Sequence, residues 1–321
     1  MVSKKPPATE VPVPHSEPQR REPLPWQKPK SPSEDWEAPA KLESILNSPS
    51  YVPAIRDVDF LDSGYARGVR LQLDFLKPEK LLIENGVRNT IVVFGSTRII
   101  EPAAAERKVG KLRDALAEEP ENCDLQQRLS IAEKVLAKSH YYATAVKFSG
   151  LVANAGGGPR DSRLVVMTGG GPGIMEAANR GSQEAGAKTV GLNITLPHEH
   201  YPNAYVSPEL CFSFHYFALR KMHFMKRAKA LVAFPGGFGT LDELFETLTL
   251  IQTRKINPLP VILVGEDFWR GVFDIEVLVD EGVIDIEDRD LFWFAETADD
   301  IWQGIVRWYE NNGESLFGKD I

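Results

Sequence analysis

Cysteine is scarce in this chain. Only Cys123 and Cys211 occur among 321 residues, and they form neither a CxxC pair nor a disulfide framework, which favours a reducing compartment. No stretch approaches the roughly 18 uncharged apolar residues that a membrane-spanning helix needs. The basic start at Lys4 and Lys5 is not followed by the apolar segment of a secretory signal. We therefore expect a cytoplasmic protein that does not contact a membrane.

An excess of positive charge is also missing. The chain carries 37 Lys and Arg against 45 Asp and Glu, for a net charge of −8. This balance argues against a main role on nucleic acid, which requires a basic surface. It leaves room for one bound anion, because a pocket can be positive on an acidic protein. A hydrophobic share of 43% is typical of a globular protein with a sizeable core.

The prolines are unevenly distributed along the chain. Ten of the 23 fall within residues 1–40, where Trp26 and Trp36 are the only aromatic residues. Such a segment buries too little apolar surface to offset the entropy cost of ordering, so we predict a disordered tail over 1–40. Apolar residues at helical spacing over 41–89 predict a helical extension. The main domain is predicted to span 90–321.

Short apolar runs alternate with helical patterns through this main domain. The runs are apolar throughout, as expected for strands buried on both faces, and the alternation is typical of right-handed βαβ units. We therefore predict an α/β fold, with a doubly wound parallel sheet flanked by helices. Strands are predicted at 90–95, 164–168, 190–196, 211–214, 230–234, 261–264 and 291–294. Helices are predicted at 103–153 with a break near Pro120, and at 174–185, 215–228, 241–253, 268–281 and 299–311.

Glycine clusters follow three of the predicted strands. They are Gly95-Ser96-Thr97-Arg98, Gly169-Gly170-Gly171-Pro172-Gly173 and Pro235-Gly236-Gly237-Phe238-Gly239-Thr240. The last two open helices, whose free N–H groups attract anions, and all three fall on the carboxyl edge of the sheet, where ligands bind. One cluster alone would indicate only a turn and a helix cap. Two in this register predict a phosphate site.

The common alternatives fail on spacing. The third glycine of GxGxxG would fall at position 174 or 242, which hold Ile174 and Asp242, and no GxxxxGK[ST] or GxSxG occurs. His198 and His200 flank Glu199 in a loop pattern rather than in HExxH on a helix, so we expect no metal.

The two longer glycine motifs carry a family resemblance. Residues 169–177 (GGGPGIMEA) and 235–243 (PGGFGTLDE) resemble the LOG ("Lonely guy") family, whose members were long mislabelled as lysine decarboxylases. The family pattern PGGxGTxxE is met at every fixed position, and the family's upstream arginine-lysine pair matches Arg220 and Lys221. The resemblance covers roughly 85–270. The long spacer between Gly95 and Gly169 places the chain nearer the larger bacterial members.

The resemblance implies a Rossmann-like fold and a homodimer, and whether dimers assemble further stays open. It also implies hydrolysis of the N-glycosidic bond of a nucleoside 5′-monophosphate to free base and ribose 5-phosphate, with no cofactor and no metal. Arg220 and Glu243 match the family's catalytic pair. Phosphate- and substrate-binding residues are expected at Gly236, Gly237, Gly239 and Thr240, and further at Gly95, Ser96, Gly170, Gly171, Gly173, Glu176, Lys221 and Pro235. The base stays open between adenine, a cytokinin-type N6-substituted adenine, and another purine or pyrimidine.

Each proposed catalytic side chain also has a structural interpretation. A carboxylate at Glu243 can stabilise positive charge that builds on the sugar, and can orient or deprotonate a water molecule. From spacing alone, Thr240 to Glu243 is better explained as a capping box, and the family resemblance reverses that order. Arg220 lies on a partly apolar helix face between Phe217 and Phe224, which favours burial. Glu176 fits either a ribose contact or the start of its helix.

Two other functions compete with hydrolysis. A non-catalytic nucleotide sensor or carrier would need the glycine loops but would not need the catalytic pair. The presence of both Arg220 and Glu243 therefore disfavours this function. Lysine decarboxylation would need a pyridoxal-binding lysine with a partner for the ring nitrogen, and no pattern in the sequence indicates one.

Overall fold

The computed structural model describes residues 28–195 and 201–317, in two compact units, 1–67 and 68–321. The predicted disordered tail falls mainly on residues 1–27, and the loop with His198, Glu199 and His200 on 196–200. Both lie outside the described residues. The first unit contains helices α1 (Ala38–Leu46) and α2 (Val58–Asp62), with short 3₁₀ turns at Pro49–Tyr51, Ala54–Arg56 and Gly64–Ala66. Neither α1 nor α2 buries a residue. The domain boundaries at 40 and 89 stay a prediction.

The second unit is built on one seven-stranded parallel sheet of order β4-β3-β2-β1-β5-β6-β7. The predicted α/β fold with a parallel sheet is confirmed. The strands are β1 (Asn89–Phe94), β2 (Leu164–Thr168), β3 (Thr189–Ile194), β4 (Cys211–Phe214), β5 (Ala228–Ala233), β6 (Val261–Val264) and β7 (Trp293–Ala295). All seven predicted strands are present, each within three residues of its predicted ends.

Helices connect these strands and cover both faces of the sheet. They are α3 (Arg67–Glu84), α4 (Pro102–Glu118), α5 (Cys123–Ala137), α6 (His140–Ala153), α7 (Ile174–Glu184), α8 (Phe217–Lys226), α9 (Phe238–Gln252), α10 (Glu266–Val272), α11 (Ile275–Asp280) and α12 (Ala298–Asn311). The single helix predicted over 268–281 is wrong. Phe273 and Asp274 adopt extended backbone there, and the Asp274 carboxylate accepts a hydrogen bond from the Glu276 N–H to start α11.

Alternate residues of each strand face opposite cores. In β1, Ile91 and Val93 pack with α6, α7 and α12, whereas Val92 and Phe94 pack with α3, α8, α9 and α10. Every residue of β2 and β6 is buried. This explains why the strands appear as continuous apolar runs in the sequence.

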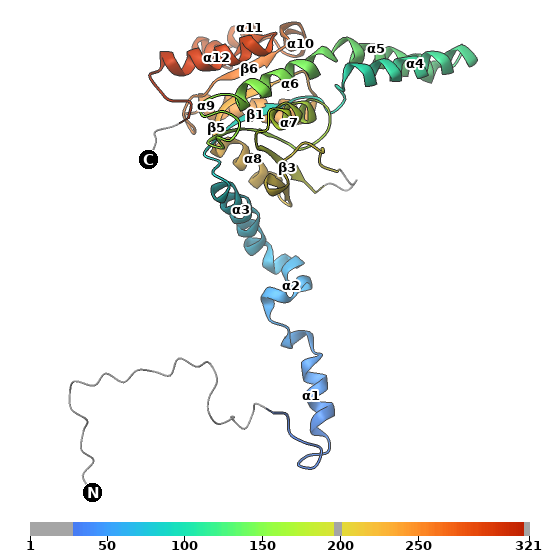
Figure 1. The fold of residues 1–321 in the computed structure, drawn as a ribbon, viewed down its shortest axis with the longest axis vertical. Helices are drawn as coiled ribbons and strands as arrows, with labels where there is room; N and C mark the ends of the chain where they lie inside the picture. Colours follow the sequence, from blue (N-terminus) through green and yellow to red (C-terminus); the bar gives the residue numbers. More distant parts are fainter. Residues whose placement is uncertain (1–27, 196–200, 318–321) are drawn as a thin grey trace, which may run out of the picture. The chain divides into compact units, whose positions relative to one another are not determined.

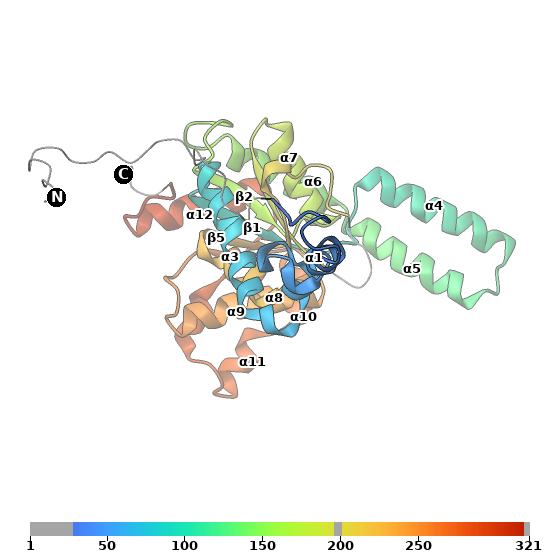
Figure 2. The ribbon, with the colours of Figure 1, turned by 90° about the horizontal axis from the view of Figure 1, so that it is seen from below.

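Helices α4 and α5 form an antiparallel hairpin that points away from the sheet (Figures 1 and 2). They fill the long stretch between β1 and α6, broken near Pro120 as predicted. Their shared core is small, formed by Val109, Leu112 and Ala132 with a few half-buried leucines. The carboxyl end of α5 returns the chain to the sheet, where α6 begins.

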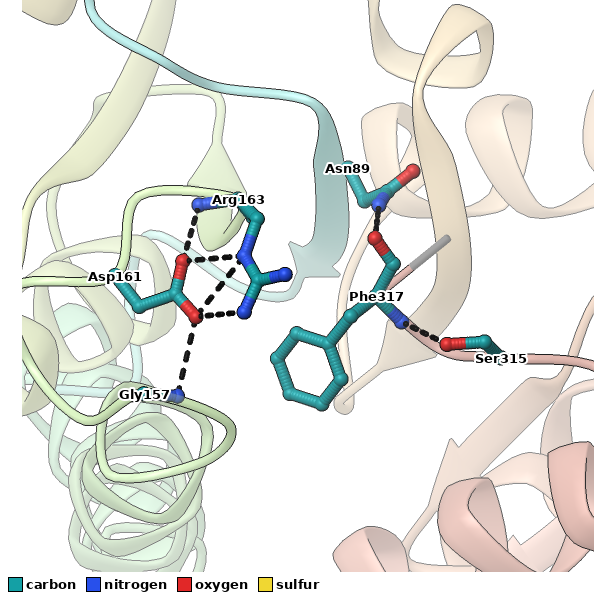
Figure 3. Close-up of polar contacts among 6 residues, drawn as sticks. All are labelled: Asn89, Gly157, Asp161, Arg163, Ser315 and Phe317. Carbon is teal, nitrogen blue, oxygen red and sulfur yellow. Dashed lines mark hydrogen bonds and ion pairs between the residues drawn. The ribbon is translucent and has the colours of Figure 1, made fainter. Parts of the chain in front are cut away.

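At the amino edge of the sheet, the C-terminal segment contacts the start of β1 (Figure 3). The Asn89 side chain, at the start of β1, donates a hydrogen bond to the Phe317 carbonyl at 3.0 Å. The Arg163 guanidinium lies 5.8 Å from the centre of the Phe317 ring and also pairs with Asp161 at 2.8 Å. These contacts lie at the edge opposite the glycine loops.

The strand order reverses between β1 and β5. The chain builds outward from β1 through β2, β3 and β4, then returns to the other side of β1 to add β5, β6 and β7. In open α/β sheets, ligands bind in the crevice beyond such a switch point. Within the described residues, none of the helices is long and apolar enough to cross a membrane.

Candidate nucleotide-binding site

A cavity of about 550 Å³ opens at the switch point. The loops that follow β1 and β5 meet there, and the Ser96 N–H donates to the Pro235 carbonyl at 2.9 Å. The cavity is lined by Phe94, Gly95, Ser96, Thr97, Arg98, Ile99, Ile131, Lys134, Val135, Lys138, Met175, Arg220, Pro235, Gly236, Gly237, Gly239, Thr240, Glu243 and Phe268. Nine of the fourteen binding and catalytic residues predicted from the sequence are in this set.

The start of α9 presents unpaired amides to the cavity. The helix begins at Phe238, after Gly237 in extended backbone, and no side chain caps it. The first helical bond is the one from the Thr240 N–H to the Gly237 carbonyl at 2.9 Å. Within the described residues, the N–H groups of Phe238 and Gly239 therefore have no acceptor. An anion at this helix start would satisfy both amides and interact favourably with the helix dipole.

The capping box predicted for Thr240 and Glu243 is wrong. It assumed that α9 begins at Leu241, whereas the helix begins three residues earlier, and both side chains lie inside it. Thr240 packs instead against the loop. A Cβ at Gly236 would lie 2.1 Å from the Thr240 Oγ1, so only glycine fits at position 236. The loop and its helix are thus packed together before any ligand arrives.

Arg220 is held in place by α8 and β3. Its Nε donates to the Leu192 carbonyl at 2.8 Å, and its guanidinium lies 5.1 Å from the centre of the Phe224 ring and 6.0 Å from that of Phe217. The face between these two rings is the apolar one expected from the sequence. Burial lowers the pKa of Arg220, and the charge of Glu243 opposes that shift. The guanidinium remains charged because its ordinary pKa is so high.

Glu243 is a buried carboxyl group on the wall of the cavity. The residue is 6% exposed, and within the described residues no donor makes a hydrogen bond to its side-chain carboxylate. Burial raises its pKa to about 7, although the charges of Lys221 and Arg220 lower it. A shifted carboxyl group in a cavity is typical of an acid–base residue in an active site. Arg220 and Glu243 face the same cavity without a direct ion pair in the described part of the chain.

The glycine loop 169–173 lies differently. Gly170, Gly171 and Gly173 do not line the cavity, and Met175 is the residue of that segment that reaches it. The Gly170 N–H donates to the Thr168 hydroxyl at 2.9 Å, and the Asn203 side chain donates to the Gly171 carbonyl at 2.9 Å. These bonds hold the loop from inside the protein.

Glu176 and Lys221 also lie outside the cavity lining. The Tyr142 hydroxyl donates to Glu176 at 2.8 Å, which places Glu176 against α6 rather than against a ligand. Lys221 forms ion pairs with Glu246 at 2.9 Å and Asp242 at 3.0 Å. Burial opposes the charge of Lys221, but these two carboxylates leave its pKa raised. The binding roles of Glu176 and Lys221 stay predictions that this geometry does not favour.

Residues of α5 line part of the cavity, and the sequence did not predict this. Ile131, Lys134, Val135 and Lys138 come from the inserted hairpin, and Phe268 comes from α10. The spacing of Ile131, Lys134, Val135 and Lys138, at i, i+3, i+4 and i+7, places them on one face of a helix. That periodicity was available from the sequence, but it did not show that this face meets the glycine loops.

The comparisons with known proteins agree with these motifs. Residues 175–305 match a family model described as "Possible lysine decarboxylase". The probable cytokinin riboside 5′-monophosphate phosphoribohydrolase LOGL5 of Oryza sativa subsp. japonica is 33% identical over 144 residues, 43% of this chain and 56% of that protein. Cytokinin riboside 5′-monophosphate phosphoribohydrolase LOG3 of Arabidopsis thaliana is 28% identical over 141 residues, 43% of this chain and 64% of that protein. The chain thus spans less than two thirds of these relatives.

Solved structures give a weaker likeness. The Moco carrier protein from Chlamydomonas reinhardtii is 17% identical, covers 70% of this chain and 99% of its own, and aligns with a TM-score of 0.40. A score this low supports no argument about function.

Fold and cavity together define an open αβα-layered domain with an anion-accepting helix start at its switch point. The family match and the plant relatives confirm the resemblance predicted from the sequence. The α/β domain of this chain is therefore similar to LOG-family proteins, over 43% of the chain for each of these two relatives.

Proposed function

We propose that this protein hydrolyses the N-glycosidic bond of a nucleoside 5′-monophosphate, releasing free base and ribose 5-phosphate. One observation carries the proposal. A buried carboxyl group with a pKa of about 7, Glu243, shares a cavity with the uncapped start of α9 and with Arg220. The LOG relatives are named as phosphoribohydrolases of one such nucleotide class, which supports the same reaction.

Two kinds of surface line the cavity, and each suits a different part of the nucleotide. The amides of Phe238 and Gly239 would bind the 5′-phosphate, while the apolar lining of Ile99, Ile131 and Phe268 offers surface to the base. Glu243 lies in α9, so the phosphate-binding amides and the carboxylate are fixed to one rigid helix. Binding at the phosphate would thereby position the ribose against Glu243.

In the proposed step, a water oxygen bonds to the anomeric carbon as the bond from that carbon to the base nitrogen breaks. The electron pair of the broken bond stays with the base, which takes up a proton. The water passes a proton to the Glu243 carboxylate, which later releases it to solvent and so offsets the proton that the base takes up from solvent; one water is consumed overall. Before the transfer, the carboxylate stabilises the positive charge that develops on the sugar. The positive charge of Arg220 lowers the pKa of Glu243 and so favours its ionised form. The guanidinium can also donate hydrogen bonds to ribose or phosphate oxygens.

The test is release of free base from a panel of nucleoside 5′-monophosphates, followed by chromatography. We expect release by the wild type and a loss of about 10²–10⁴-fold in kcat for Glu243→Gln, with nucleotide binding retained. Asp242→Asn is the matched control, because Asp242 is the exposed neighbour on the same helix, and it should keep wild-type activity. Full activity in Glu243→Gln would refute the mechanism. Nucleotide binding without release by the wild type would favour the sensor or carrier. The homodimer and the cytoplasmic location stay predictions.

A further inference from the structure

The cavity carries more positive charge than one phosphate requires. Its lining holds the four cations Arg98, Lys134, Lys138 and Arg220 and one carboxylate, Glu243. The chain as a whole has a net charge of −8. Positive charge is therefore concentrated at this cavity on an otherwise acidic protein, an arrangement that focuses anionic ligands.

Three of these cations have no side-chain partner among the residues that the structure describes. Arg220 is bonded to the Leu192 carbonyl and packed between aromatic rings. The side chains of Arg98, Lys134 and Lys138 make no hydrogen bond or ion pair with any residue in the described ranges. Elsewhere on the hairpin, by contrast, Arg113 pairs with Glu133 at 2.7 Å.

The cationic lining continues along the hairpin. An adjoining cavity of about 390 Å³ shares Thr97, Arg98, Ile131 and Val135 with the first. It adds Lys108 and Arg128, of which Arg128 pairs with Asp124 at 3.5 Å, and includes no acidic residue in its lining. The open space and the positively charged lining therefore continue past the loop that follows β1, on the side where α4 and α5 leave the sheet.

The 5′-phosphate does not account for these side chains, because the amides at the start of α9 already offer it donors. We propose that Arg98, Lys134 and Lys138 form a second anion subsite, which binds a phosphoryl group that the nucleotide carries in addition to its first phosphate. This proposal rests on the proposed function and extends its substrate class from nucleoside 5′-monophosphates to nucleotides that carry a second phosphoryl group. The additional group can extend the 5′-phosphate into a diphosphate or stand on the 3′ hydroxyl.

Calorimetric titration tests the subsite. AMP, ADP and adenosine 3′,5′-bisphosphate are titrated into the full-length protein, as wild type and in the Glu243→Gln background that suppresses turnover. We expect ADP or the 3′,5′-bisphosphate to bind at least about tenfold more tightly than AMP, the effect of one charge-assisted contact. Which of the two gains affinity distinguishes the two positions of the group.

Two double variants locate the effect. Lys134→Gln/Lys138→Gln should abolish the gain in affinity and leave AMP binding unchanged. Arg107→Gln/Lys111→Gln removes the same charge from exposed positions of the hairpin that line neither cavity, and should keep the gain. Raising the salt concentration should shrink the gain, because it screens exposed charges.

Four results would overturn the proposal: equal affinity for all three nucleotides, binding of none, a gain that survives in Lys134→Gln/Lys138→Gln, or a loss of AMP affinity in that variant equal to the loss for the doubly phosphorylated ligands. The last would assign these lysines to the 5′-phosphate itself. Base release is measured separately. A preserved binding pattern without release would refute the hydrolase and keep the subsite.

Discussion

The two glycine-rich loops after β2 and β5 are alike in sequence and different in structure. Loop 235–240 lines the cavity, and a Cβ added at Gly237 or Gly239 would meet nothing within 4 Å. In loop 169–173, the same addition at Gly170 would lie 2.4 Å from the Asn193 amide, and at Gly173 2.4 Å from the Ser96 carbonyl. Loop 235–240 is thus open at Gly237 and Gly239, although Gly236 packs against Thr240, whereas loop 169–173 is packed against the protein.

The difference shows two uses of glycine at a sheet edge. The start of α9 keeps its first amides unpaired, whereas the first amide of α7, that of Ile174, donates to the Ser96 carbonyl at 3.2 Å. A Cβ at Gly169 would lie 2.6 Å from an Arg220 nitrogen, so that glycine makes room for the arginine. We infer that loop 169–173 shapes the site through Ser96 and Arg220, and that loop 235–240 binds the anion.

The largest effect is expected at Gly173. Its φ of +73° is unfavourable for an L-residue, and the Cβ of an alanine there would meet backbone atoms of Ser96 and Thr97 at 2.4–2.9 Å. Gly173→Ala should cost about 2–4 kcal/mol of unfolding free energy, measured by urea denaturation. A variant as stable as the wild type would show that this loop is not held by packing, and the contrast between the loops would fail.

The smallest effect on stability is expected at Gly239. Its backbone is helical and a Cβ there has open space, so Gly239→Ala should change the unfolding free energy by less than about 1 kcal/mol, toward greater stability. The added methyl group would obstruct an anion at the neighbouring amides, so nucleotide affinity should fall about tenfold. Unchanged affinity, measured by calorimetry, would contradict the assignment of the phosphate to this loop.

The sheet and the cavity's position were predictable from the sequence because they depend on local pattern. Apolar runs such as Ile91–Phe94 are buried on both faces, and the loops that follow parallel strands must share one edge. The order of strands was not predictable, since nothing local places β5 beside β1. That adjacency brings loop 235–240 against Ser96, whereas the loop after β2, which also neighbours β1, contacts Ser96 through Ile174 and leaves Gly170 and Gly171 outside the cavity.

The sequence predicted a capping box that is not formed and did not indicate that two lysines of the hairpin line the cavity; each failure has a physical cause. The capping box failed because the extended backbone of Gly237 lets α9 start at Phe238, ahead of Thr240. The contribution of Lys134 and Lys138 was missed because a charged helix face has the same pattern whether it meets solvent or a cavity. Long-range contact, not residue type, separates those two cases.

The pH dependence of kcat/KM for base release tests the central claim most directly. Glu243 must be ionised to accept the proton from water, and its pKa in the folded protein is about 7. The rate constant should therefore rise from pH 5 with an apparent pKa of about 7 and level off above pH 8 in the wild type; in Asp242→Asn the same rise should come at slightly lower pH, because the charge of Asp242 raises the pKa of Glu243. The residual rate of Glu243→Gln should lack this ionisation. A wild-type rate constant that is flat or falls through pH 7 would contradict a role for Glu243 as the general base.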